Sequence, residues 1–542
     1  MLWVDAVCIN QSDIEERGHQ VKLMRRIYKN ATRVLIWIGE DIQFNNGHGS
    51  KSAAATAFQI LDDIYYHMNV KYAMAARPTE ARTIEARPGV KAPGIKFILS
   101  KRASPVTKGY KLIKNDETGR ARPRFNRTWR AVEQFFMSPW FGRQWIVQEV
   151  VVAKEAVVIW GHEKIEWHRV GEVANWMKID YPPRRRQLIA GAYNASYVYY
   201  LTMESKTANR FHPFLSVVVS AWNSQASDPR DKIYAMLGLP NSDSDPDKGE
   251  LFLEPDYTLT TGEVYTAFAR RVLEKERTLR LFSAVQHHPY ASITTPSWVP
   301  QWRPSTTEPL VPIGSVTNRM PDYSLPDQSI FTVDQDLLTL RGRTLGRIIG
   351  DSVIIPPHQQ AVNISSQYLE NLMVSIENIL AVQDMRLDLP RLKVLCWTLT
   401  VGRGNDLWAS HVNHWDTFQV LWLEARKAFA AGDWRLIGQY GESMDEYGNE
   451  MLQPAIHNFL GSATHGRRVF VTSKGLIGLG PAALQPEDVV VVLFGGFTPF
   501  VLRKVEDYYL LVGECYVHGK MDGIEEWEDE GEVEEDEEFR LR

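Results

Sequence analysis

The sequence predicts an α/β domain at the amino end, a mostly helical middle and a small β-barrel-like region near the carboxyl end. Three observations carry this prediction. Strand-like apolar runs flank a helical pattern in the first 39 residues. Helical spacing dominates residues 169–328, and short β-branched runs separated by Gly and Pro follow residue 467. With 44% hydrophobic and 23% charged residues, the chain has the composition of a globular protein.

The first 39 residues are predicted to form a strand, a helix and a second strand. Residues 2–9 (LWVDAVCI) are dense in apolar and β-branched side chains, as a buried strand is. Ser12 and Glu15 have the spacing of a capping box, and apolar residues at helical spacing follow. Residues 34–38 (VLIWI) form a second apolar run that ends at Gly39. This order indicates parallel strands joined by a right-handed crossover.

The first domain is predicted to extend over residues 1–168. Within it, residues 77–124 are rich in Pro, Gly, Lys and Arg and show weak periodicity, so we expect a surface insertion, partly disordered. After this insertion the pattern predicts two helices and then two strands, at 128–136, 143–153, 156–160 and 164–167.

A β-rich domain is predicted over residues 329–522, with a helical insertion at about 366–460. Residues 329–349 alternate like paired strands, and we expect them to join a small antiparallel barrel that is formed after the insertion. Its other strands are expected at 468–472, 489–493, 500–504 and 508–512.

The last residues form a strongly acidic end. Residues 525–538 hold 11 acidic side chains in 14 positions, and without them the net charge of −5 becomes +6. Such a run repels itself, so residues 523–542 are predicted to be a disordered, solvated tail. The remainder is only mildly basic, which does not indicate nucleic-acid binding.

The three cysteines and the absence of targeting signals favour the cytoplasm. Cys8, Cys396 and Cys515 are far apart and lie in apolar surroundings, so they are interpreted as buried thiols in a reducing compartment. No run approaches the length of a membrane helix, and Asp5 interrupts the apolar start that a signal peptide would need. No Cys or carboxylate cluster supports a metal site near His411 and His414.

Several segments resemble those of the fungal heterokaryon incompatibility (HET) domain family. Residues 2–11 (LWVDAVCINQ) closely resemble its central motif, and residues 143–149 (RQWIVQE) resemble its closing motif. Residues 228–234 (DPRDKIY) and 296–298 (PSW) are similar to segments that commonly follow the domain. The family's opening strand lies upstream of the part seen here, so we expect a truncated domain that lacks its first strand and exposes the edge of a neighbouring strand.

The resemblance implies a fold and an activity for the first domain. The HET domain looks distantly like the Toll/interleukin-receptor (TIR) domain, which has a flavodoxin-like parallel sheet. Some TIR domains hydrolyse NAD through a Glu four residues after a Trp, and Trp145 and Glu149 have that spacing on one helical face. Glu149 is therefore the candidate catalytic residue, and Trp145 a candidate contact for NAD. NAD would be a substrate, and no cofactor is required.

Two further residues are candidate contacts for NAD. Asp5 and Arg17 are predicted near strand ends, where open α/β sheets bind ligands. A structural alternative exists for each candidate. Glu149 would pair with Arg143 or a backbone donor, and Asp5 would pair with Arg17 as a buried strand-to-helix ion pair.

Two functions follow from these interpretations. In the first, the chain triggers programmed cell death on incompatible cell fusion by TIR-like NAD hydrolysis, and self-association raises the activity. In the second, it is a non-catalytic signalling module, or an inert truncated copy. Its expected partners are other incompatibility proteins or NLR-type signalling proteins, together with copies of itself.

Overall fold

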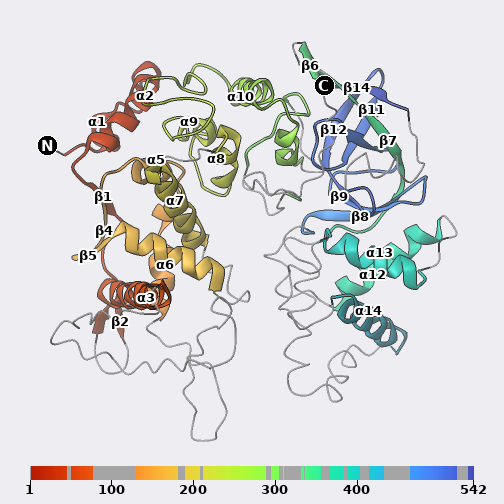
Figure 1. The fold of residues 1–542 in the computed structure, drawn as a ribbon, viewed down its shortest axis with the longest axis horizontal. Helices are drawn as coiled ribbons and strands as arrows, with labels where there is room; N and C mark the ends of the chain where they lie inside the picture. Colours follow the sequence, from red (N-terminus) through yellow and green to blue (C-terminus); the bar gives the residue numbers. More distant parts are fainter. Residues whose placement is uncertain are drawn as a thin grey trace, which may run out of the picture. The chain divides into compact units, whose positions relative to one another are not determined.

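The chain, seen here in a computed structural model, divides into two compact units (Figure 1). The first unit comprises Met1–Phe211 with Ser224–Leu251, and the second comprises His212–Asn223 with Phe252–Arg542. The predicted domains group the chain differently, and their boundaries stay predictions. The structure describes residues 2–45, 50–76, 129–180, 190–207, 212–287, 294–303, 309–310, 331–334, 336–355, 366–382, 385, 387–402, 414–431, 464–521 and 535–542.

The chain begins with a helical turn, α1 (Asp5–Cys8), so the predicted buried strand over residues 2–9 is wrong. Leu2 and Val7 are 74% and 82% exposed, and Cys8 is exposed as well, although a buried thiol was predicted. An apolar run becomes a strand only where a neighbouring strand satisfies its backbone. In the described part of the chain, no strand pairs with residues 2–9.

Helix α2 (Ile14–Asn30) follows, one residue later than the capping-box pattern predicts. The cap is Asp13, whose carboxylate accepts a hydrogen bond from the Glu16 N–H at 3.0 Å. The prediction of Ser12 as the cap is therefore wrong. An Asp cap also places negative charge at the positive end of the helix dipole.

The first unit contains a three-stranded mixed sheet in the order β1-β4-β5. Strand β1 (Val34–Trp37) runs parallel to β4 (Ala156–Trp160), and β5 (Glu163–Glu166) pairs with β4 antiparallel. In β1 burial alternates, since Leu35 and Trp37 are 54% and 52% exposed while their neighbours on the other face are buried. Strand β1 thus forms an edge of the sheet with one apolar face in solvent.

The sheet and its helices confirm an α/β class for this unit, with a correction to the predicted topology. The parallel partner of β1 is β4, more than 120 residues later, and not the segment 2–9. The crossover between β1 and β4 therefore runs through helices that follow β1. The flavodoxin-like arrangement stays a prediction.

Helices cover this small sheet and carry most of the core. Helices α3 and α6 contact the sheet, and α6 packs along α7 (Figure 1). The further elements of the unit are β2 (Gln43–Asn45), β3 (Ser50–Ser52), α3 (Ala53–Ala76), α4 (Trp129–Phe136), η1 (Pro139–Gly142), α5 (Ile146–Val151), α6 (Trp167–Asp180), α7 (Ala190–Thr207) and α9 (Asp231–Tyr234).

An aromatic cluster fills the centre of the first unit. Phe58, Phe135 and Trp160 meet with ring centroids 5.5–6.3 Å apart, and Phe135 also contacts Phe141. Such edge-to-face pairs stabilise a core beyond their burial alone. At Gly191 a Cβ would lie 1.9 Å from the Phe136 carbonyl oxygen, so glycine is required where α7 approaches α4.

The second unit begins with helices that pack through aromatic side chains. Its first elements are α8 (Phe214–Ser220), α10 (Thr261–Glu276) and η3 (Arg280–Ala284). Helix α10 has a complete capping box, in which the side chains of Thr260 and Glu263 each accept the other residue's backbone N–H. Phe214 stacks on Phe252 at 4.6 Å between centroids.

A β-barrel follows, and its strands agree closely with the sequence pattern. The predicted strands at 468–472, 489–493, 500–504 and 508–512 are confirmed within two residues, and the described residues of the predicted segment 329–349 join them. The strands are β6 (Phe331–Asp334), β7 (Leu337–Asp351), β8 (Arg467–Thr472), β9 (Ile477–Pro481), β10 (Val489–Leu493), β11 (Phe500–Val505), β12 (Tyr508–Glu514), β13 (Tyr516–Val517) and β14 (Glu537–Leu541).

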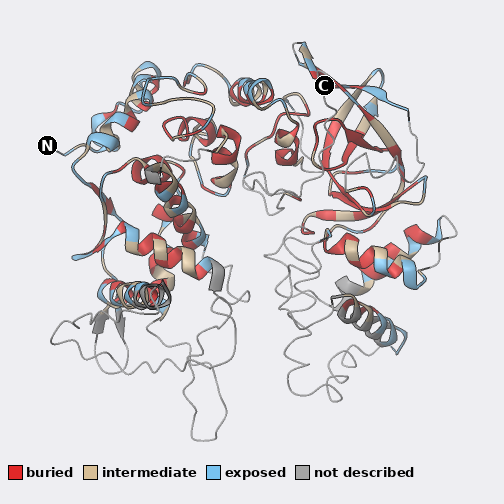
Figure 2. Cartoon of the chain, viewed as in Figure 1, coloured by how far each residue is buried: buried red, intermediate tan, exposed pale blue. Residues whose placement is uncertain are grey.

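Strand β7 closes the barrel. The sheet order runs β10-β11-β12-β14-β7, and β7 pairs with β10 as well, which makes a ring of five strands. At Gly342 a Cβ would lie 2.1 Å from the Val492 carbonyl oxygen, so the close approach of β7 to β10 requires glycine there. All five residues of β10 are buried (Figure 2).

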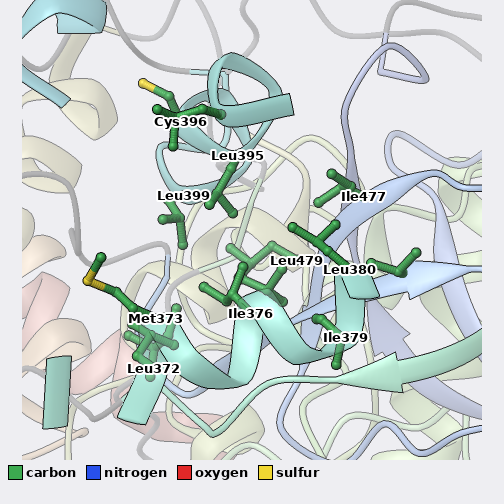
Figure 3. Close-up of a cluster of buried hydrophobic side chains, with 14 of the residues drawn as sticks. Leu372, Met373, Ile376, Ile379, Leu380, Leu395, Cys396, Leu399, Ile477 and Leu479 are labelled. Atoms are coloured by element: carbon green, nitrogen blue, oxygen red, sulfur yellow. The ribbon is translucent and has the colours of Figure 1, made fainter. Parts of the chain in front are cut away.

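Helices pack on the barrel through a second core. They are α12 (Ser366–Ala381), α13 (Leu389–Leu399) and α14 (His414–Ala431), which lie in the predicted helical insertion. Leucine and isoleucine side chains from α12 and α13 meet Ile477 and Leu479 of β9 (Figure 3). This cluster includes Cys396, which is a buried thiol as predicted, and Cys515 is buried as well.

A buried ion pair lies inside the second unit. The Arg467 guanidinium on β8 donates to the Glu514 carboxylate on β12 at 2.8 Å, and both side chains are at most 2% exposed. Glu514 also accepts the Leu310 N–H at 2.6 Å. Hydrogen bonds to both partners offset the cost of removing two charges from water.

The acidic tail is partly ordered. Residues Glu537–Leu541 form β14, which pairs antiparallel with β7 and parallel with β12, so the predicted disorder is wrong for these residues. Phe539 and Leu541 are buried, and Asp536 pairs with Arg341 and Arg343 at 2.8 and 2.9 Å. Alternating apolar residues and basic neighbours on β7 thus outweigh the repulsion among the carboxylates.

Some predictions fall on residues outside the described ranges. They include the insertion at 77–124, the cap at Thr128, His411 and residues 522–534. In the part of the chain that is described, no helix combines the length and apolar character needed to cross a membrane.

Candidate functional site

Glu149 lies on a short buried helix of the first unit. Helix α5 (Ile146–Val151) is shorter than the predicted 143–153, and all six of its residues are buried. Trp145 precedes the first turn, and its carbonyl accepts the Glu149 N–H at 3.2 Å. Trp145 and Glu149 are therefore one helical turn apart, as the spacing predicted.

The Glu149 carboxyl group is buried close to a second carboxylate. Burial raises its pKa to about 7, the nearby Arg143 guanidinium opposes this rise, and the Asp5 carboxylate adds to it. The side chain is 8% exposed, and no hydrogen bond to it is present among the described residues. The structural alternative, in which Glu149 pairs with Arg143 or a backbone donor, stays a prediction, since the Arg143 charge does act on Glu149.

Arg143 is shared between the two carboxylates. It lies 3.9 Å from the Asp5 carboxylate, and its side chain is half exposed, so solvent screens the interaction. Asp5 stands in the first turn of α1 and accepts the Ala6 N–H at 2.8 Å. The predicted Asp5–Arg17 pair is not formed.

Tyr28 on α2 is a fourth member of the site, and the sequence pattern did not assign it a role. Burial raises the pKa of its hydroxyl, and the negative charges of Glu149 and Asp5 raise it further. The hydroxyl is therefore neutral at physiological pH and able to donate a hydrogen bond. Its ring meets Trp3 edge to face at 5.5 Å. Helical spacing placed Tyr28 on an apolar face, so the pattern indicated core packing only.

Arg17 binds a different carboxylate. Its guanidinium donates to Asp228 at 2.6 Å, and Arg230 donates to the same carboxylate at 2.8 Å. Burial opposes the ionisation of Asp228, but the hydrogen bonds from Arg230 and Arg17 outweigh it and lower its pKa. Arg17 thus has a structural partner, which the sequence pattern did not identify.

The indole of Trp145 is also held by a residue that was not predicted. Its Nε1–H donates to the Asp231 carboxylate at 3.0 Å. Asp228 and Asp231 both belong to the segment 228–234, which stood out in the sequence for its family resemblance only. The acidic residues of that segment could have indicated polar contacts from the sequence, but only the fold reveals that their partners are arginines and an indole.

The cluster of Asp5, Tyr28, Arg143 and Glu149 can perform proton-transfer chemistry. A carboxyl group with a pKa near 7 exchanges protons at physiological pH, which suits a general acid or base. In the described residues, no three His, Cys, Asp or Glu side chains are grouped to hold a metal ion. A separate pocket of about 440 Å³ lies in the second unit and contains none of the predicted site residues.

Comparisons with known proteins agree with the resemblance in the sequence. Residues 1–149 match the family model described as heterokaryon incompatibility protein (HET), and residues 406–540 match the Het-6 beta-barrel domain. Heterokaryon incompatibility protein 6, OR allele, of Neurospora crassa is 24% identical over 592 residues, covering 96% of this chain and 81% of the relative. No solved structure matches. The predicted resemblance to the HET domain family is confirmed.

Proposed function

We propose that this chain, whose residues 1–149 match the HET family model and whose residues 406–540 match the Het-6 beta-barrel model, acts in fungal non-self recognition and triggers cell death on incompatible fusion. The name of the Neurospora relative supports the first part, because the alignment covers 96% of this chain. Other incompatibility proteins or NLR-type signalling proteins are its proposed partners.

The proposed reaction is hydrolysis of the bond between nicotinamide and ribose in NAD. This bond breaks with its electron pair on the nicotinamide nitrogen, and water adds to the ribosyl carbon. Glu149 in its ionised form stabilises the cation that develops on the ribose and accepts a proton from the water. The products are nicotinamide, ADP-ribose and a proton.

One observation carries this proposal: the Glu149 carboxyl group is buried without a hydrogen-bond partner among the described residues and has a pKa of about 7. Such a carboxylate is costly to the fold, and acidic groups shifted in this way concentrate at functional sites. Arg143 is a better candidate than Arg17 for the NAD pyrophosphate, because Arg17 already binds Asp228 closely. Trp145 would contact a ring of NAD.

The test measures NAD cleavage by the full chain at several protein concentrations, with Glu149→Gln as the active-site variant. Glu155→Gln is the matched control, since Glu155 is an exposed acid of the same unit that pairs with Arg33. We expect cleavage that rises with pH through about 7 and persists in the control. In Glu149→Gln, which lacks the carboxylate charge, the rate should fall at least about a hundredfold. NAD left intact at every concentration would end the catalytic proposal.

A second candidate function, self-association without catalysis, is favoured by strand β1. The N–H groups of Val34 and Ile38 donate toward β4, so those of the alternate residues Leu35 and Trp37 point to the open edge. Two copies of β1 can pair antiparallel about Ile36. In this register Leu35 lies opposite Trp37 of the second copy. The exposed apolar side chains of the two copies then pack against each other, and the open backbone groups of the two edges form hydrogen bonds.

Charge supports this register as well. In this register Arg33, which also pairs with Glu155, lies opposite Gly39 and one residue from Glu40, so opposite charges come near each other at both ends. The full chain should sediment as a dimer, and Trp37→Lys should make it monomeric. Val374→Lys, at an exposed apolar position in the second unit, is the control and should leave the dimer intact. A monomer at every concentration would exclude pairing through β1.

A further inference from the structure

We infer that residues Ser224–Leu251 are a clamp that positions Trp145 and Glu149 by binding helices α2 and α5 at the same time. The match to the HET family model ends at residue 149, yet Ser224–Leu251 belongs to the same compact unit. The clamp is inferred from contacts in the structure, whereas its effect on catalysis rests on the proposed function.

The clamp holds α2 at three points. Asp228 binds Arg17 near the start of the helix. Further along, the Arg25 guanidinium donates to Asp247 at 2.8 Å and to the Gly238 carbonyl, and Lys29 reaches the same Asp247. Arg25 is buried, and its bond to the Gly238 carbonyl forms away from solvent, whereas Asp247 and Lys29 are about half exposed. These bonds leave α2 little freedom to turn or slide relative to the clamp.

The clamp holds α5 through its first turn and through Gln148. Asp231 accepts the Trp145 indole N–H, and the Gln225 carbonyl accepts the Gln144 N–H at 2.8 Å. In the amide orientation that satisfies both of its polar atoms, Gln148 donates to the Ala235 carbonyl at 3.1 Å. A Cβ at Gly238 would lie 2.6–3.0 Å from atoms of the Gln148 carboxamide, so a larger residue there would displace the Gln148 side chain.

These contacts matter because α5 is too short to be rigid by itself. A helix of six residues gains little from its own hydrogen bonds, so its position comes from tertiary contacts. Glu149 lies one turn after Trp145, and Tyr28 lies one turn after Arg25. The clamp therefore fixes both helices of the site, α2 with Tyr28 and α5 with Glu149, which contact each other.

The first test is independent of any activity. Hydrogen exchange is measured on the full chain carrying Asp231→Leu, Asp231→Asn or Asp245→Asn. Asp245 is the matched control, because it pairs with Lys248 inside the clamp itself. Losing the hydrogen bond to Trp145 should speed exchange of the α5 amides about tenfold in Asp231→Leu. Asn retains an acceptor oxygen, so Asp231→Asn should stay within about twofold of the native chain, as should Asp245→Asn.

The second test asks whether the clamp positions the reacting group. Asp231→Leu should lower kcat for NAD cleavage at least about tenfold with a smaller change in KM, and should move the pH midpoint of kcat away from about 7. Asp231→Asn should restore most of the rate. If the α5 amides exchanged hydrogen at an unchanged rate in Asp231→Leu, the inference that the clamp holds α5 would be wrong, whether or not the chain cleaves NAD. Faster exchange with an unchanged kcat and pH midpoint would overturn its positioning role.

Discussion

Two buried glutamates, one in each unit, have opposite surroundings. Glu514 in the barrel accepts hydrogen bonds from Arg467 and from the Leu310 N–H. Burial raises the pKa of Glu514, while Arg467 and Leu310 act in the opposite direction. Glu149 has no such bonds among the described residues; the nearby Arg143 guanidinium lowers its pKa, and the Asp5 carboxylate raises it.

The difference separates a structural acid, Glu514, from the acid that we propose as catalytic, Glu149. The Glu514 carboxylate joins two strands through Arg467 and accepts the Leu310 N–H. A buried carboxylate without donors destabilises the fold when it is charged, and such a cost is retained where the group has a chemical role. Three predictions test this contrast.

The largest effect is expected from Arg467→Met. This change leaves Glu514 buried without its cation, so the free energy of unfolding of the second unit should fall by about 3–5 kcal/mol. Urea unfolding, followed by a signal from the barrel, measures it. The double variant Arg467→Met with Glu514→Leu should recover most of the loss, since no charge then remains buried. Equal destabilisation in the single and double variants would show that groups other than Arg467 stabilise the Glu514 charge.

A smaller change in the free energy of unfolding, in the stabilising direction, is expected from Glu149→Gln. The folded pKa of about 7 lies above the ordinary value of 4.5, so native stability should fall as pH rises through this window and level off above it. A neutral Gln avoids that loss. At pH 8 the variant should therefore be more stable than the native chain by up to about 3 kcal/mol, and at pH 4 nearly equal to it.

Urea unfolding of the first unit at both pH values measures this difference. Glu155→Gln again serves as the control, because its exposed carboxylate should show little pH-dependent change. If the Glu149→Gln variant were no more stable than the native chain at pH 8, the Glu149 charge would have a compensating partner, and the contrast with Glu514 would fail.

The smallest effect is expected from Asp247→Asn in the clamp. Hydrogen bonds from Arg25 and Lys29 lower the pKa of Asp247 to about 2, so its contribution is present above about pH 4 and is lost as pH falls toward 2. Its side chain is half exposed, so the variant should lose only about 1 kcal/mol or less at pH 6. Acid titration of unfolding compares the two chains, and a loss as large as that of Arg467→Met would contradict the assigned exposure.

The barrel could be predicted from the sequence, and the first sheet could not. Strand β10 (Val489–Leu493) is a β-branched run bounded by turn residues, and such a local pattern suffices to identify a strand. Residues 2–9 have a similar apolar density, but Asp5–Cys8 form a helical turn, and Leu2 and Val7 are exposed. Their conformation depends on whether a partner strand lies beside them, which local patterns do not show. The partner of β1 is β4, and only long-range contacts reveal it.

The sequence could predict which residues belong to the site, but not which residues they contact. The spacing of Trp145 and Glu149 correctly placed them one turn apart, because helical periodicity is a local property. Their surroundings come from Tyr28 and Asp231, which the fold brings from far along the chain. Charge alone suggested a pair between Asp5 and Arg17, yet Asp5 lies near Arg143, and Arg17 binds Asp228.

The position of β14 in the barrel has a consequence for synthesis on the ribosome. The ring of strands contains residues 537–541, and the Ser297 N–H donates to the carbonyl of Arg542. A nascent chain can form the first unit early, but its barrel stays open until those last strand residues have emerged. A product cut short by premature termination would lack the closing strand and expose its neighbours' edges, which favours its removal by quality control. In a protein with a proposed lethal action, this order makes translation through residue 541 a condition for a folded barrel.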